Sequence, residues 1–168
     1  MNNAAHFHLL INHLPILLPF LGLLILLFGL ILRSEVVKRI AFGLFIMGAF
    51  GAVLTNFSGE GAEEIAEKMG KSHELIHEHE ESAELFTILS VILGLLSGIS
   101  LWLNWVTSPL RKVAKYLTIG MALVVIYFTK PTGNSGAAIS HPEVKLSEKE
   151  ITEKFKNQSE EHSEEHED

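Results

Sequence analysis

Four long apolar stretches, separated by polar segments, dominate the pattern of this chain. A helix needs about 20 apolar residues to cross the roughly 30 Å hydrocarbon core of a bilayer. The stretches are near that length and contain no Asp or Glu, and the shortest holds one Lys whose side chain can reach the headgroups. The predicted membrane spans are residues 14–32, 40–57, 85–106 and 113–128. This pattern predicts an all-α fold, a four-transmembrane-helix up-and-down bundle.

Two amphipathic segments lie between the second and third apolar stretches. Apolar residues within 62–69 repeat at the i, i+3, i+4, i+7 spacing of a helix that lies on a surface. Gly70 is expected to end this helix, after which a second helix continues into the third span. In the second helix His79 shares a stripe with apolar residues, whereas His73 and His77 fall on the polar face. We therefore expect short amphipathic helices on the outer face of the bundle, with His79 turned inward.

Prolines and glycines interrupt the pattern near both ends of the membrane region. Pro15 removes a backbone hydrogen bond and clashes with the preceding turn, so residues 8–13 are expected to be kinked. Residues 130–136, rich in Pro, Asn and Gly, are expected to form a turn rather than a helix. The predicted organisation is a membrane domain at 1–142 with a periplasmic loop at 58–81, and an acidic tail at 143–168 that begins with a short helix and is then disordered.

The distribution of charge orients the predicted spans. Lys and Arg concentrate in the loops at 33–39 and 107–112, whereas the loop at 58–81 is rich in glutamate. Because basic loops stay in the cytoplasm, both termini are expected outside, in the periplasm of a bacterium whose inner membrane holds this multi-pass protein. No basic segment precedes the first apolar run, so we expect a retained span rather than a cleaved signal peptide.

Composition narrows the chemistry open to the chain. The sequence contains no cysteine, which excludes disulfides, covalent c-type heme attachment, iron–sulfur clusters and thiolate zinc sites. A net charge of −7, carried mostly by the outer loop and the tail, argues against a nucleic-acid partner and leaves the lipid bilayer as the expected environment. No P-loop, dinucleotide fingerprint or Ser–His–Asp pattern is visible, so the sequence does not decide whether the protein is an enzyme.

All nine histidines fall on the predicted outer side of the membrane. Imidazole is the usual neutral ligand for heme iron and for Zn or Cu. Four of these histidines, from the mouth of the first span, the outer loop and the segment after the fourth span, are expected to converge on the outer mouth of the bundle, where a nearby carboxylate adds an oxygen ligand. The predicted cofactor ligands are His8, His13, His79 and His141, and the predicted metal ligands are the same four histidines with Glu60.

Four short motifs occur together: HLLINHLPI at 8–16, GEGAE at 59–63, EHEE at 78–81, and TGNSG through HPE at 132–143. As a set they resemble the DUF2231-type family of small four-helix bacterial membrane proteins, in the form found in Bacteroidetes. The resemblance covers about residues 6–145, and Ala137 stands where the family copies carry a second glycine. Related domains occur beside c-type cytochrome domains, which implies respiratory electron transfer with a periplasmic c-type cytochrome or a respiratory complex as partner.

Three functions fit these observations. The first is a b-type cytochrome, in which heme b lies between a histidine of the first span and His79. The second is a mononuclear or dinuclear Zn, Cu or Fe site, which the crowding of histidines at one end favours. The third is a non-catalytic subunit of a larger membrane complex.

Overall fold

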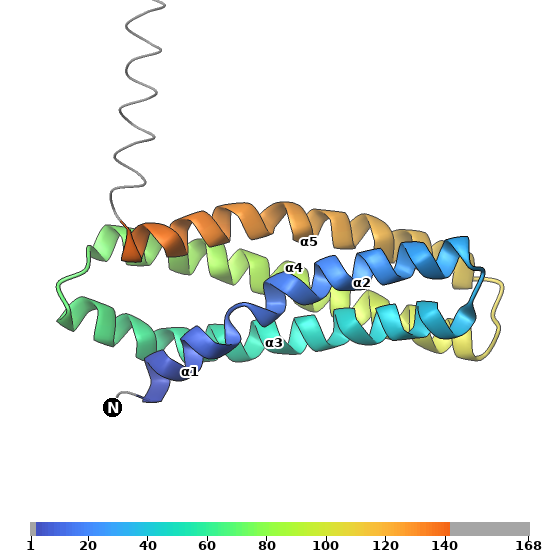
Figure 1. The fold of residues 1–168 in the computed structure, drawn as a ribbon, viewed down its shortest axis with the longest axis horizontal. Coiled ribbons are helices and arrows are strands. Elements are labelled where there is room, and N and C mark those ends of the chain that lie inside the picture. Colours follow the sequence, from blue (N-terminus) through green and yellow to red (C-terminus); the bar gives the residue numbers. More distant parts are fainter. Residues whose placement is uncertain (1–2, 142–168) are drawn as a thin grey trace, which may run out of the picture.

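The computed structural model describes residues 3–141, which form five helices and no strand (Figure 1). The helices are α1 (Asn3–Ile11), α2 (Leu14–Ile31), α3 (Glu35–Lys68), α4 (His73–Trp105) and α5 (Arg111–Ser140). From α2 onward each helix packs against the next, α5 also contacts α2, and the turns alternate between the two ends of the molecule. The all-α class predicted from the sequence is therefore confirmed for the described residues.

Four segments are long and apolar enough to cross a membrane: His6–Ile31, Glu35–Lys68, His73–Trp105 and Arg111–Ile139. Large apolar side chains such as Phe28, Phe50 and Leu95 are exposed along them, which suits a surface in contact with lipid rather than water. The longest helix, α3, has 34 residues and is about 50 Å long, so its ends reach beyond a hydrocarbon core of roughly 30 Å. The fold thus has the length and composition of a multi-pass membrane protein.

The interior of the bundle pairs small residues on one helix with larger side chains on the next. A Cβ at Gly22 of α2 would lie 2.7 Å from Cε1 of Phe45 in α3, so the missing side chain makes room for this fully buried ring. Between α3 and α4, a Cβ at Gly94 would lie 2.6 Å from Cβ of Ala49. Close approach of this kind strengthens dispersion contacts between helices in lipid, where a hydrophobic driving force is absent.

One predicted break in the helices is absent between the second and third spans. α3 continues through Gly59 and Gly61 to Lys68, so the expected separate amphipathic helix is instead the end of α3. Only residues 69–72 connect α3 to α4, in place of the predicted loop at 58–81, and Gly70 adopts a positive φ of 76° there. Each glycine costs a helix only about 1 kcal/mol relative to alanine, and packing of α3 against α4 outweighs that cost.

The turn predicted at residues 130–136 is wrong, because α5 runs through this segment without interruption. Pro131 removes one backbone donor inside the helix. Two neighbouring hydroxyls hold the segment in place. Thr132 Oγ1 donates to Ser82 O of α4 at 3.1 Å, and Ser135 Oγ donates to Thr132 O within α5 at 3.0 Å. Tertiary contacts therefore override the weak local propensity of the Pro, Asn and Gly residues.

The predicted kink before the first span is confirmed. α1 ends at Ile11, α2 begins at Leu14, and Asn12 and His13 form a turn between them. Pro15 lies in the first turn of α2, where its missing N–H leaves no hydrogen bond unmade. The turn lets α1 pack against α3. The acidic tail predicted at 143–168 lies outside the described residues.

Candidate functional site

His8, on α1, is anchored to α3. Its Nδ1 atom lies 3.1 Å from Thr55 O and 3.1 Å from Ser58 Oγ. A carbonyl oxygen only accepts, and the Ser58 hydroxyl gives its own hydrogen to Thr55 O at 2.9 Å. Both contacts therefore require the ring to donate, so His8 carries its proton on Nδ1. No described residue bonds to Nε2, whose lone pair is left for another partner.

His79, on α4, is anchored to α5 in the same manner. Its Nδ1 atom lies 3.0 Å from Ser135 Oγ, and that hydroxyl donates to Thr132 O at 3.0 Å. Ser135 must then accept from the ring, which leaves the proton of His79 on Nδ1 and the lone pair on Nε2. The prediction from periodicity is confirmed at this position, because His79 is half-buried whereas His73 and His77 are exposed.

The two anchored rings lie at the same end of the bundle and interact electrostatically with one another. Both are half-buried, His8 held on the α3 side and His79 on the α5 side. A Cβ at Gly136 would lie 3.0 Å from Cε1 of His79, so this ring packs directly on the α5 backbone. A Cβ at Gly59 would lie 3.9 Å from Cε1 of His8. We refer to these two rings as the His8–His79 pair.

The other predicted ligands are on the surface. His13 is exposed in the turn between α1 and α2, Glu60 is exposed on α3, and His141 is exposed just after the end of α5. Of the predicted set, the structure thus brings together His8 and His79. Periodicity identified His79, but no local signal in the sequence distinguished His8 from His13, because that choice depends on how α1 packs against α3.

A second grouping of metal-ligating side chains was missed by the sequence analysis. Among the described residues, Glu63, Glu67 and His73 place ligand atoms within 4.8 Å of one another. His73 Nδ1 lies 2.9 Å from Glu67 Oε1, which joins the end of α3 to the start of α4. The i, i+4 spacing of Glu63 and Glu67 could have indicated a shared metal. The sequence analysis placed them on a separate surface helix rather than on the end of α3, so it did not predict that they lie opposite His73. We refer to these residues as the acidic grouping; its His73 and Glu67 are exposed.

The fold and composition define the class: a helical chain with four segments able to span a membrane. No protein-family model, curated protein or solved structure matches the chain. The resemblance to the DUF2231-type family therefore stays a prediction.

Proposed function

We propose that this protein is an integral membrane protein in which His8 and His79 would hold heme b, each through its Nε2 atom. One observation carries the proposal: both rings are held by Nδ1, so both Nε2 lone pairs are available at the same end of the bundle. Donation of the other ring N–H to a carbonyl or hydroxyl is the usual way in which a protein orients a metal-bound histidine. A heme held in this way supplies one-electron transfer.

The donor set favours heme over a bare metal ion at this pair. A heme with two histidine ligands needs only those two groups from the protein, because the porphyrin supplies four nitrogens. Protein sites for Zn or Cu draw on three or more side chains. The other predicted ligands, His13, Glu60 and His141, are exposed, and the three-ligand acidic grouping lies elsewhere in the described part of the chain.

In this proposal the heme exchanges electrons with a periplasmic c-type cytochrome or a respiratory complex across the outer surface of a bacterial inner membrane. The charge distribution supports this orientation. Basic residues such as Lys38, Arg39 and Arg111 lie at the end of the bundle opposite the His8–His79 pair. Because basic loops are retained in the cytoplasm, the pair then faces the periplasm.

A Zn, Cu or Fe ion is the second candidate, and the acidic grouping favours it. One imidazole and two carboxylates provide mixed nitrogen and oxygen ligands of the kind that such ions accept. The exposure of two of its three members weighs against it, because solvent competes for the ligands and exposed ion pairs of this kind form without any metal.

The visible absorption spectrum of the full-length protein, purified in detergent from a heme-producing host, tests the proposal together with metal analysis. We expect a Soret band, with α and β bands on reduction, that is lost in H8A and in H79A. H77A is the matched control, because His77 is an exposed histidine of the same helix. A colourless protein whose stoichiometric metal is lost in H73A supports the second candidate instead. A colourless and metal-free protein contradicts both the heme and the metal-ion candidates, and the remaining candidate is a non-catalytic subunit of a membrane complex.

A further inference from the structure

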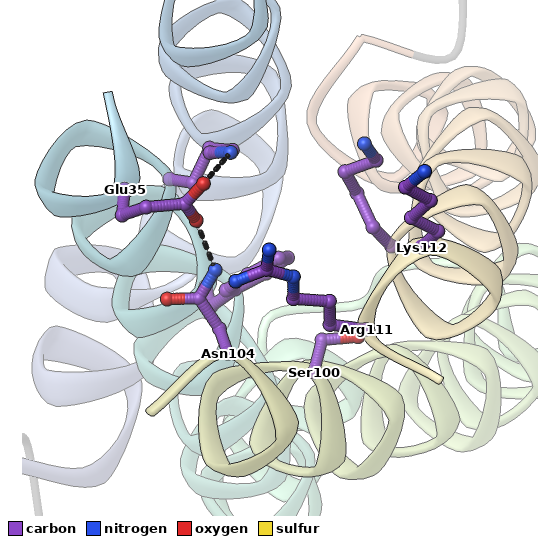
Figure 2. A pocket seen from close by; sticks show the side chains of 8 residues that line it. Glu35, Ser100, Asn104, Arg111 and Lys112 are labelled. Atoms are coloured by element: carbon purple, nitrogen blue, oxygen red, sulfur yellow. Dashed lines mark hydrogen bonds and ion pairs between the residues drawn. The ribbon is translucent and has the colours of Figure 1, made fainter. Parts of the chain in front are cut away.

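A cavity of about 110 Å³ lies at the end of the bundle opposite the His8–His79 pair, where α3, α4 and α5 meet (Figure 2). The polar and charged side chains that line it include Glu35 and Lys38 of α3, Asn104 of α4, and Arg111, Lys112 and Lys115 of α5. Four of them are cationic and one is acidic, which leaves an excess of three positive charges. Since about 10–15 Å³ accommodates one water, the cavity has room for a group of several heavy atoms. We refer to it as the basic cavity.

The carboxylate of the basic cavity is already engaged by its own wall. Glu35 Oε1 accepts from Lys38 Nζ at 2.7 Å, and Glu35 Oε2 accepts from the Asn104 amide. Asn104 Oδ1 in turn accepts from Arg39 Nε at 2.7 Å. In Figure 2 the Arg111 side chain extends from α5 toward Asn104. Both carboxylate oxygens of Glu35 are therefore occupied by Lys38 and Asn104, which they hold in position.

The cations that α5 contributes are not neutralised in this way. The side chains of Arg111 and Lys112 make no hydrogen bond or ion pair with any described residue, although Arg111 acts electrostatically on Glu35. They belong to the first turn of α5, which contains no acidic residue and whose helix dipole adds positive potential. Because the cations around the cavity outnumber the single carboxylate, the space attracts an anion, and the planar guanidinium of Arg matches phosphate oxygens in a two-point contact.

Exposed aromatic residues indicate the depth of the basic cavity in a membrane. Trp102 and Trp105 end α4, Tyr116 lies in the second turn of α5, and all three are exposed. Arg39 lies 5.0 Å from the centre of the Trp105 ring. Trp and Tyr concentrate at the level of the lipid headgroups, where basic pockets between helices bind anionic headgroups.

From these observations we infer that the basic cavity binds a phosphate group, the chemistry shared by anionic phospholipid headgroups and free phosphate. Arg111 and Lys112 supply the charge-assisted hydrogen bonds, while Lys38 and Asn104 form the inner wall. The inference uses none of the residues of the His8–His79 pair, so it stands independently of heme binding.

The test uses purified full-length protein in detergent and its R111Q/K112Q variant. Native mass spectrometry measures binding of phosphatidylglycerol against phosphatidylcholine, and calorimetry measures binding of inorganic phosphate. We expect phosphatidylglycerol or phosphate to bind saturably, and R111Q/K112Q to weaken that binding about tenfold or more. Binding of phosphatidylglycerol alone identifies the lipid as the source, whereas binding of inorganic phosphate identifies the soluble anion.

K71Q/K130Q is the matched control, because it removes the same charge at the other end of the bundle. This variant should bind phosphatidylglycerol and inorganic phosphate as strongly as the unaltered protein does. Helical circular dichroism and the unfolding midpoint show that each variant is folded. The inference is overturned if neither probe binds saturably, if phosphatidylcholine binds as well as phosphatidylglycerol, or if K71Q/K130Q loses as much binding as R111Q/K112Q.

Discussion

His79 and Ser135 join α4 to α5 through one hydrogen bond, in which the ring Nδ1 lies 3.0 Å from the serine Oγ. Because Ser135 passes its own hydrogen to Thr132 O, the contact also decides which nitrogen of His79 is protonated. A single serine thus sets both the direction of the imidazole and the Nε2 lone pair that it presents. Ser58 plays the same role for His8, because its hydroxyl accepts from His8 Nδ1 and donates to the backbone carbonyl of Thr55.

The S135A substitution should weaken the preference of His79 for the tautomer protonated on Nδ1. The ring loses the Ser135 hydroxyl and keeps only its contact with the Thr132 backbone, so the fraction of rings protonated on Nε2 should increase, and the free energy of unfolding should fall by about 1 kcal/mol. Nitrogen-15 NMR of histidine-labelled protein reports both ring nitrogens directly. The control is S82A: within the described residues the Ser82 hydroxyl donates to Glu78 O and makes no hydrogen bond to His79, so the His79 signals should not change. Identical His79 signals in S135A and the unaltered protein would contradict the tautomer assignment.

Two glycines of α5 should respond differently to replacement by alanine. At Gly133 no heavy atom lies within 4 Å of the new Cβ, so G133A should raise the free energy of unfolding by up to about 1 kcal/mol through helix propensity. At Gly136 the new Cβ lies 3.0 Å from Cε1 of His79, so the ring must move. We expect G136A to lack the gain and to shift the His79 NMR signals. Equal stabilisation by both changes would show that the ring does not pack there.

The contact between α2 and α3 should tolerate no added methyl group. G22A places a Cβ 2.7 Å from the buried Phe45 ring, and overpacking of this kind costs about 1–3 kcal/mol. G43A, inside α3, meets no heavy atom within 4 Å and, like G133A, should raise the free energy of unfolding by up to about 1 kcal/mol through helix propensity. Denaturant unfolding in detergent measures both. A G22A protein as stable as G43A would mean that these helices do not approach so closely.

The orientation of the spans can be tested with reporter fusions. A reporter placed at residue 36 should be cytoplasmic and one at residue 70 periplasmic, because the basic residues flank the first of these positions. Activity of a periplasmic reporter at residue 36, with none at residue 70, would reverse the topology. The His8–His79 pair would then face the cytoplasm, and a periplasmic redox partner would be excluded.

The sequence predicted the features that belong to single segments. Four apolar runs without acidic residues were sufficient to predict four helices, because the length needed to cross a membrane is a property of each run alone. The inward position of His79 followed from its stripe, since Ile76 and Phe86 on the same stripe are buried. The errors arose at the start of the loop predicted at 58–81 and at the turn predicted at 130–136, where glycine and proline destabilise a helix by less than its packing against neighbouring helices stabilises it.

Only the tertiary structure decided which of these residues meet. His8 and His79 are anchored at the same end of the bundle because α1 packs against α3 and α4 packs against α5, and the serines that anchor the two rings lie 50 and 56 residues away in the sequence. The basic cavity likewise forms where α3, α4 and α5 come together at one end. These pairings depend on the rotation and axial offset of packed helices, which contacts such as Gly22 with Phe45 and Gly94 with Ala49 determine. No single segment contains that information, because each such contact requires both helices.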